Sequence, residues 1–134
     1  TEALAPGVPH ARVHLHPLPR VMGDAKLLRQ LLETQPIPTA IICGNAHLAV
    51  GAVLEALALG IRLPDDLSIV GYDDIEIMSH LPVPVTTVRV PGAEIGQVAA
   101  QVLIARLEGL DCSASFEAEA ELGIRASSGP PPQI

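Results

Sequence analysis

The stretch PTAIICGN, residues 38–45, decides the fold of this chain. Residues 39–43 form a short apolar run between a proline and a glycine, which is typical of a strand buried on both faces of a parallel sheet. The chain turns immediately afterwards, and an Ala- and Leu-rich helix is expected over 46–59, with Gly60 as its C-terminal cap. A buried strand that runs directly into a helix predicts an α/β fold.

The same alternation extends along the chain in both directions. Strands are expected at Ala11–His16, 67–72, 86–90 and within 115–125, and helices at 21–33 and at about 91–108, with one helical turn within 75–85. Strands that alternate with helices favour a parallel sheet with helices packed against it. We therefore predict a three-layer α/β/α domain with a mostly parallel sheet.

Two of the predicted helices differ in their surfaces. The helix over 94–108 keeps most of its polar side chains on one stripe, which predicts a surface helix with one buried face. The helix over 46–59 has only His47 and Glu55 as polar side chains, so it needs cover on more than one face. It is either the central helix of a larger domain or part of a subunit interface.

Composition narrows the classes of function. The formal net charge is -7, from 8 basic and 15 acidic side chains, so this segment is a poor binder of nucleic acid by itself. No apolar run is long enough to span a membrane, and no signal peptide is recognisable. The two cysteines, Cys43 and Cys112, are read as free thiols. We expect a cytoplasmic protein that does not associate with membranes.

Polar side chains follow two of the buried strands. Asn45 comes shortly after the strand at 39–43, and Asp73 comes directly after the strand at 67–72. Ligands of open α/β sheets bind at the carboxyl ends of strands, and an amide beside a carboxylate suits the hydroxyl groups of a sugar or polyol. The alternative is structural: Asn45 caps the following helix, and Asp73 accepts hydrogen bonds from backbone amides in its own turn.

Signs of catalysis or metal binding are weak. Asp73 and Asp74 are consecutive and tend to point apart, which makes them a poor acid–base pair. His14 and His16 share a strand face, but no third ligand is evident. There is no dinucleotide fingerprint, phosphate-binding loop or nucleophile elbow. We predict that the chain is not an enzyme and takes no metal or cofactor.

Several motifs in a fixed order resemble the LacI/GalR family of bacterial transcription regulators. They are PTAIICGN (38–45) with LAVGA (48–52), GIRLPDDLSIVGYDDI (60–75), LPVPVTTV (81–88) and ELGIRAS (121–127). The resemblance covers about residues 20–128. It implies a type I periplasmic-binding-protein-like fold of two lobes with a ligand cleft between them, in which residues 1–128 form most of the C-terminal lobe. Residues 129–134 are expected to be a flexible, proline-rich tail.

The resemblance also implies a function. The chain would be the ligand-sensing and dimerisation part of a regulator whose operator affinity is set by a small effector, such as a sugar or polyol. Operator DNA would be bound only through a helix-turn-helix that we expect to lie outside residues 1–134. A solute-binding protein of a sugar uptake system, which shares the fold, is the alternative.

The resemblance assigns roles to particular residues. Asn45 and Asp73 match residues that contact the effector in sugar-responsive members. Val50 and Leu81 match the family's dimer interface, and Leu54 is assigned to the same face, so a homodimer through the helix Ala46–Leu59 and the Leu81 region is expected. The chain departs from the family at Ala46, where an aspartate is usual.

Overall fold

The computed structural model describes residues 2–4, 12–14, 25–33, 37–112 and 115–131. The elements are β1 (Glu2–Leu4), β2 (Arg12–His14), α1 (Ala25–Leu32), β3 (Ala40–Ile42), α2 (Ala46–Ala58), β4 (Ser68–Tyr72), α3 (Ile77–His80), β5 (Thr86–Arg89), α4 (Gly92–Leu107) and β6 (Glu121–Gly123). None of the helices in these ranges is both long enough and apolar enough to cross a membrane.

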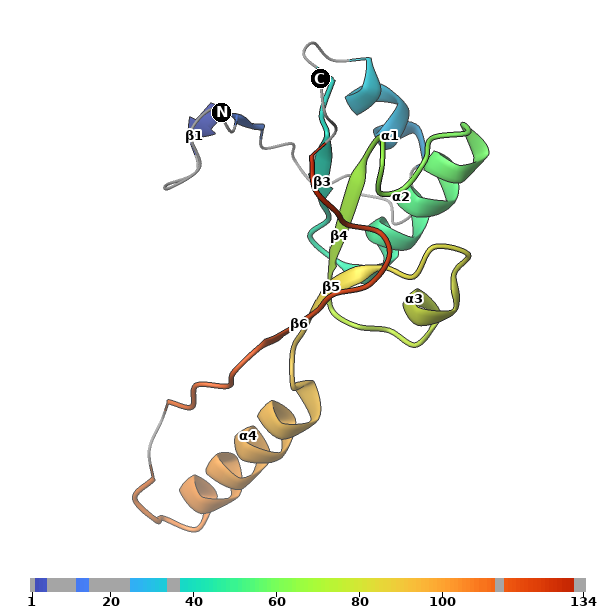
Figure 1. Ribbon diagram of the computed structural model, residues 1–134. Coiled ribbons are helices and arrows are strands. Elements are labelled where there is room, and N and C mark those ends of the chain that lie inside the picture. The colour runs from blue at the N-terminus through green and yellow to red at the C-terminus, as the bar shows by residue number, and fades with distance from the viewer. Residues whose placement is uncertain (1, 5–11, 15–24, 34–36, 113–114, 132–134) are drawn as a thin grey trace.

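The main sheet has four strands in the order β3-β4-β5-β6 (Figure 1). β3, β4 and β5 run parallel, and β6 pairs antiparallel with β5. The predicted mostly parallel α/β sheet is therefore confirmed. The strand expected at Ala11–His16 is present as β2, but it pairs with β1 in a separate hairpin. The remainder of that predicted strand lies outside the described residues.

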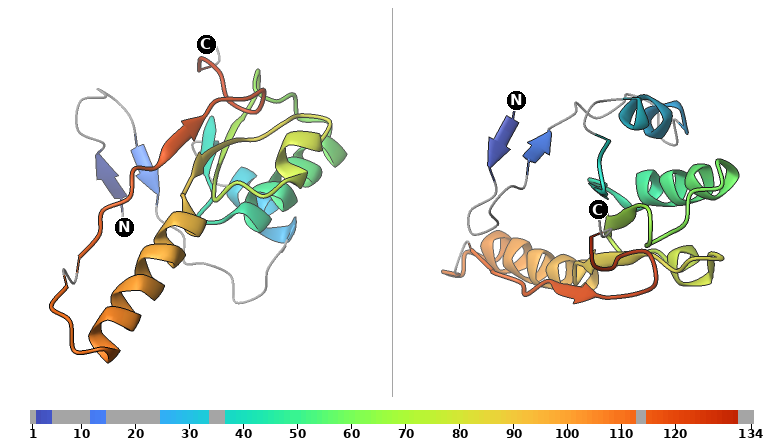
Figure 2. Two further views of the ribbon diagram at one scale, coloured as in Figure 1. Left: turned by 90° about the horizontal axis from the view of Figure 1, so that it is seen from below. Right: turned by 45° about the horizontal axis from the view of Figure 1, so that its top comes forward.

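The core lies between the main sheet and one layer of helices. α1, α2 and α3 lie on the same side of the sheet (Figures 1 and 2). Ile69 of β4, Val53 of α2 and Met78 of α3 are fully buried there. Gly71 of β4 faces this layer, because an added Cβ would lie 2.6 Å from Met78 Cε and 3.0 Å from Ala49 Cβ. The backbone of β4 thus approaches the helices more closely than any side chain at this position allows.

The expectation that residues 39–43 are buried on both faces is wrong. Ile42 is 82% exposed, and Ala40 is also exposed. β3 is the edge strand of the four-stranded sheet, with β4 as its one paired neighbour there. Ile41 packs against the core, whereas Ile42 alternates to the opposite face, away from the helices.

The expectation that the helix over 94–108 buries one face is also wrong. α4 has no buried residue, and Leu103 and Leu107 are 60% and 79% exposed. The helix projects away from the sheet body beyond the end of β5 (Figures 1 and 2). Its apolar stripe is real, but among the described residues only the returning segment near Phe116 lies beside it. An apolar stripe indicates that one face of a helix packs against another segment, but it does not indicate which segment that is.

A glycine with left-handed backbone follows two of the helices, and at Gly60 this confirms the expected cap. Gly60 follows α2 with a φ of +73°, and Gly109 follows α4 with a φ of +75°. In the first case the Gly60 amide donates to the Leu57 carbonyl and the Ile61 amide to the Ala56 carbonyl, so a Schellman motif ends the helix. Left-handed backbone at these positions favours glycine because there is no Cβ to clash.

The C-terminal segment packs against the sheet up to the beginning of the expected tail. Ser127 is fully buried: its hydroxyl donates to the carbonyl of Ile69 and accepts from the amide of Thr86. The Gly129 amide donates to Ser68 Oγ at 3.2 Å, so the packed segment also includes the first residue of the expected tail. These hydrogen bonds join the segment to β4 and β5. Residues 132–134 lie outside the described part of the chain.

Candidate ligand-binding site

The parallel strands bring three strand ends to one edge of the sheet. Ile42 pairs with Val70, and Tyr72 pairs with Val88, so β3, β4 and β5 all end in the same direction. Asn45 follows β3 and Asp73 follows β4 directly. The structure therefore places both predicted ligand-binding residues at the carboxyl edge of the sheet, where ligands of α/β proteins bind.

Asn45 is the N-cap of α2. Its Oδ1 accepts a hydrogen bond from the Leu48 amide at 2.9 Å, with the Asn45 backbone extended. The structural interpretation of this residue is therefore correct for its side-chain oxygen. The side-chain NH₂ group of Asn45 makes no hydrogen bond within the described residues. Asn45 thus has donors left for a ligand at the beginning of α2.

Asp73 has a different environment. Its φ is +67°, and among the described residues it is the one non-glycine residue with left-handed backbone. Its backbone carbonyl accepts a hydrogen bond from Thr87 Oγ1 at 2.7 Å. Its exposed carboxylate accepts none from a described residue, which argues against the structural alternative. Such strained backbone persists only where its surroundings enforce it, and it often occurs in ligand-binding sites.

Asp74 points into the protein rather than to solvent. Its side chain is 10% exposed, and Arg125, itself 19% exposed, binds it through two hydrogen bonds of 2.8 Å. Arg89 adds hydrogen bonds of 2.9 and 3.1 Å to Oδ2. Hydrogen bonding to Arg125, and then to Arg89, outweighs burial and lowers the pKa of Asp74. The carboxylate of Asp74 is thus engaged within the protein, whereas that of its neighbour Asp73 is exposed.

Replacing Asp74 with asparagine is expected to lower the free energy of unfolding by about 1–3 kcal/mol at pH 7, because a partly buried arginine then loses its charged partner. The folded-state pKa lies below the ordinary value of 3.8. The stabilisation is therefore complete above the ordinary value and is lost as pH falls through the folded-state pKa. Urea unfolding of both proteins at pH 7 and pH 3 measures this.

The matched control is Asp66→Asn, which removes the exposed Arg62–Asp66 pair. Its effect on unfolding should be much smaller, since exposed pairs contribute little. A gap between wild type and Asp74→Asn that stays constant down to acid pH would contradict the assignment of the stabilisation to the carboxylate.

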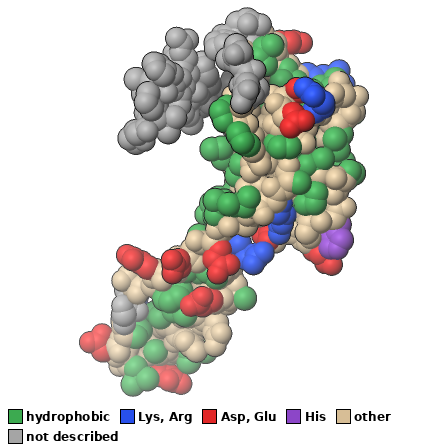
Figure 3. All heavy atoms as spheres, viewed as in Figure 1, with side chains coloured by type: hydrophobic (Ala, Val, Ile, Leu, Met, Phe, Trp, Pro, Cys, Tyr) green, Lys and Arg blue, Asp and Glu red, His purple; other side chains and the backbone are tan. Residues whose placement is uncertain are grey.

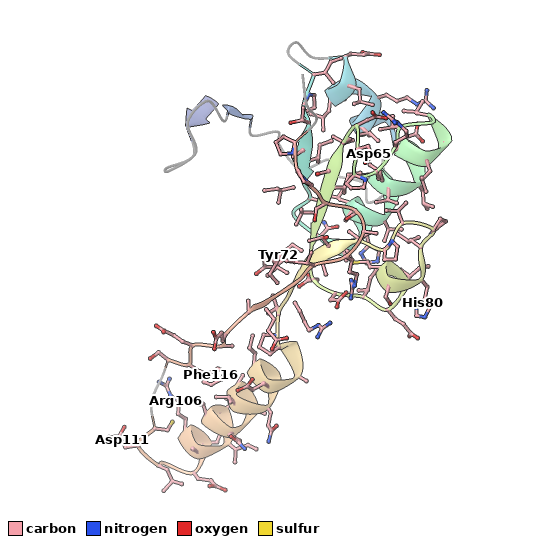
Figure 4. The ribbon with its side chains drawn as sticks, viewed as in Figure 1. Asp65, Tyr72, His80, Arg106, Asp111 and Phe116 are labelled. Atoms are coloured by element: carbon pink, nitrogen blue, oxygen red, sulfur yellow. The ribbon has the colours of Figure 1, made fainter. Side chains whose placement is uncertain are left out.

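Three residues near the site were not singled out by sequence reasoning. Arg89 and Arg125 lie outside any recognisable binding motif, and of the two only Arg125 lies within a family-like segment, ELGIRAS (121–127). Tyr72 is 45% exposed next to Asp73 and lies at the end of the sheet body (Figure 4). Exposed aromatic rings commonly line small-molecule sites.

The cysteines and the possible metal ligands are the remaining candidate groups. Burial raises the pKa of the Cys43 thiol to about 11, so it is a poor nucleophile at neutral pH. Both cysteines are free. Within the ranges that the structure covers, no three His, Cys, Asp or Glu side chains are placed to hold a metal ion. The predicted His14–His16 pair is not tested, because His16 lies outside those ranges.

The comparisons with known proteins agree with this fold. Residues 2–128 match the family described as "Periplasmic binding protein-like domain". The chain is 36% identical to the transcriptional repressor CytR of Escherichia coli over 107 residues, which are 79% of this chain and 31% of CytR. It is 34% identical to a lactose operon repressor of Rhizobium radiobacter over 77% of this chain and 91% of that protein. The chain thus spans about a third of the length of CytR.

Solved structures give the same result. A LacI family transcriptional regulator from Bifidobacterium animalis superposes with a TM-score of 0.76 at 34% identity, covering 80% of this chain and 40% of that one. A LacI family regulator from Mycobacterium smegmatis gives a TM-score of 0.71 at 34% identity, covering 84% and 43%. A regulator from Lactobacillus casei with bound sucrose gives 0.67 at 28% identity, covering 78% and 39%.

The family match and the relatives together define the class of protein. The chain belongs to the periplasmic binding protein-like domain family, in the form found as the effector-binding domain of LacI/GalR transcription regulators. The relatives named above are repressors and transcriptional regulators, and they favour a regulatory domain over a solute-binding protein.

Proposed function

We propose that this chain forms one side of an effector-binding cleft in a LacI/GalR regulator, and that Asp73 is its principal ligand-binding residue. The observation that carries this proposal is the state of Asp73: an exposed carboxylate on strained backbone, held at the carboxyl edge of the sheet with no partner among the described side chains. Asn45, at the same edge, supplies amide donors to the same ligand.

A sugar or related polyol is the proposed class of effector. A carboxylate accepts hydrogen bonds from adjacent hydroxyl groups, an amide donates to them, and the exposed ring of Tyr72 offers an apolar surface. Two relatives support this class: one is named a ribose operon repressor, and the structure of a LacI family regulator contains bound glucose. Ala46 leaves no carboxylate at the first turn of α2, so the ligand relies on Asp73 for its charged contact.

DNA binding is proposed to occur elsewhere in the regulator. Acidic side chains are prominent on the α4 part of the surface in Figure 3, and the chain as a whole carries a net charge of -7. Such a surface is repelled by phosphates. The proposed role of this chain is therefore to sense the effector in the cytoplasm and to alter operator affinity through the rest of the protein.

A thermal-shift screen on the full-length regulator tests the ligand class. We expect at least one of D-ribose, D-glucose and sucrose, at millimolar concentration, to raise the melting temperature, because a ligand that binds only the folded state stabilises it. Sodium chloride at the same osmolality is the control. A wide panel of sugars and polyols with no stabilising member, or stabilisation by a nucleoside alone, would contradict the proposed class.

A homodimer through α2 is the second part of the proposal. Only one face of α2 is buried, through Ala46, Ala49, Val53 and Ala56. Val50 and Leu54 lie beside that face, one helical turn apart, and Leu54 is 49% exposed. Leu81 is only 9% exposed and belongs to the core of this chain, so it offers a partner little surface. The proposed interface therefore depends chiefly on Val50 and Leu54.

Val50→Asp is expected to convert the dimer to a monomer at micromolar concentration, because an unpaired carboxylate would be buried at the interface. Light scattering after size-exclusion chromatography measures the mass. Ala52→Asp is the matched control, since Ala52 is also half-buried but lies on the opposite flank of α2's buried face. A folded Val50→Asp protein that remains dimeric would rule out this interface.

A further inference from the structure

Asp74 accepts hydrogen bonds from two segments that are far apart in sequence. Arg89 is the last residue of β5, and Arg125 follows β6 by two residues. Both guanidinium groups reach the same Oδ2 atom of Asp74, at 2.9 and 2.8 Å, and Arg125 also donates to Oδ1 and to the Val85 carbonyl. We call this group of Asp74, Arg89 and Arg125 the clasp.

The two segments are the ones that connect the sheet body to α4. The chain leaves the body after Arg89, forms α4, and returns through β6 to Arg125 (Figures 1 and 2). Acidic and basic side chains meet where the body narrows toward α4 (Figure 3). A weaker ion pair of 3.7 Å between Arg89 and Glu121 lies across the same two strands. The clasp therefore lies at the base of the arm formed by α4 and its connections.

The clasp is also covalently adjacent to the proposed ligand residue. Asp74 directly follows Asp73, so the arginines that bind its carboxylate also restrain the turn at Asp73. On the other side of that turn, the hydroxyl of Thr87 donates a hydrogen bond to the backbone carbonyl of Asp73. Thr87 is fully buried and lies two residues before Arg89 on the same strand. The unusual backbone of Asp73 is thus fixed by contacts to β5 and to the returning segment, the two connections of α4.

We propose that Arg125 is a positioning residue. By binding Asp74, it fixes the turn at Asp73 relative to the two connections of α4, so that these three segments move together. On this account the position of α4 and the ligand geometry at Asp73 are energetically coupled, because neither connection can shift without moving Asp74. The importance for effector response rests on the proposed function. The coupling itself does not, since it follows from the clasp contacts.

The experiment is hydrogen–deuterium exchange with mass spectrometry on the full-length protein, without ligand. Arg125→Met is compared with wild type in peptides that contain residues 72–75 and 89–92. We expect exchange at least ten-fold faster in both peptides, and an intermediate increase in Arg125→Lys, which keeps the charge but not the two-pronged contact.

Two controls separate positioning from general stability. Arg62→Met removes an exposed ion pair, and Val53→Ala removes core packing without touching the clasp. Both should leave exchange in the two peptides within two-fold of wild type under native conditions. Faster exchange confined to residues 121–129, or equal acceleration in Val53→Ala, would overturn the proposal. Because no ligand is used, this outcome is independent of whether Asp73 binds an effector.

Discussion

Replacing Asp73 with alanine is expected to weaken effector binding by the full-length regulator at least ten-fold and to abolish the response at physiological effector concentrations. Hydrogen bonds to a charged group contribute about 1.5–3 kcal/mol each, which corresponds to about 10- to 150-fold in affinity. Isothermal titration with the sugar identified by the thermal-shift screen measures the change. Asp73 has no side-chain partner within the described chain, so the loss falls on the ligand.

The backbone of Asp73 requires a second variant. Alanine is disfavoured at a φ of +67°, whereas asparagine tolerates it, so Asp73→Asn removes the charge while the turn remains. We expect Asp73→Asn to lose most of the affinity as well. Asp65→Ala, at an exposed position in the loop after α2, is the control and should bind normally. Unchanged affinity in both Asp73 variants would refute the ligand assignment.

Gly71→Ala is expected to lower the free energy of unfolding by about 1–3 kcal/mol, because overpacking a filled core forces its neighbours to shift. The added Cβ would lie 2.6 Å from Met78 Cε, 3.0 Å from Ala49 Cβ and 3.2 Å from Thr87 Oγ1. Met78 can move its terminal methyl group, but Ala49 can yield only by a shift of α2. Urea unfolding gives the difference in stability.

Gly96→Ala is the matched control for this substitution. Gly96 lies within α4, and no atom lies within 4 Å of an added Cβ. Alanine there should raise helix stability by up to about 1 kcal/mol, since glycine is a poor helix former. We therefore expect Gly71→Ala to lower the free energy of unfolding and Gly96→Ala to raise it, although both replace glycine with alanine. If Gly71→Ala were as stable as wild type, the close approach of β4 to the helices would be contradicted.

The sequence predicted the elements well because the signals were local. A short apolar run before Gly44, and Gly60 after the following helix, define strand and helix ends without reference to the rest of the molecule. Which faces of these strands and helices are buried could not be predicted from local signals. Ile42 looks like a core residue in sequence, but its burial depends on a second layer of structure on its face of the sheet, and that layer is not among the described residues.

α4 shows the same limit more clearly. Its apolar stripe indicated a buried face, but Leu103 and Leu107 are exposed because the chain leaves the sheet body after Arg89. Figure 4 shows Arg106 and Phe116 where α4 and the returning segment lie side by side, away from the core. Amphipathic periodicity encodes the need for a partner and carries no information about the direction in which the helix leaves the sheet.

The candidate site was predictable in part. Strand order places Asn45 and Asp73 at one edge, and this follows from parallel pairing alone. The left-handed backbone of Asp73 and the burial of Asp74 were not predictable, since both depend on contacts with Thr87 and Arg125, far away in sequence. The adjacent aspartates therefore differ: the carboxylate of Asp73 is exposed and accepts no hydrogen bond from a described residue, whereas that of Asp74 is paired with Arg125.

The most direct test of the central claim is the operator affinity of the full-length regulator with and without the stabilising sugar. An effector-binding domain predicts a change of about 5- to 150-fold, which corresponds to a coupling of about 1–3 kcal/mol between the two sites. The same sugar should have no effect on operator affinity in Asp73→Asn. A sugar that binds this protein tightly and leaves its operator affinity unchanged would contradict the account.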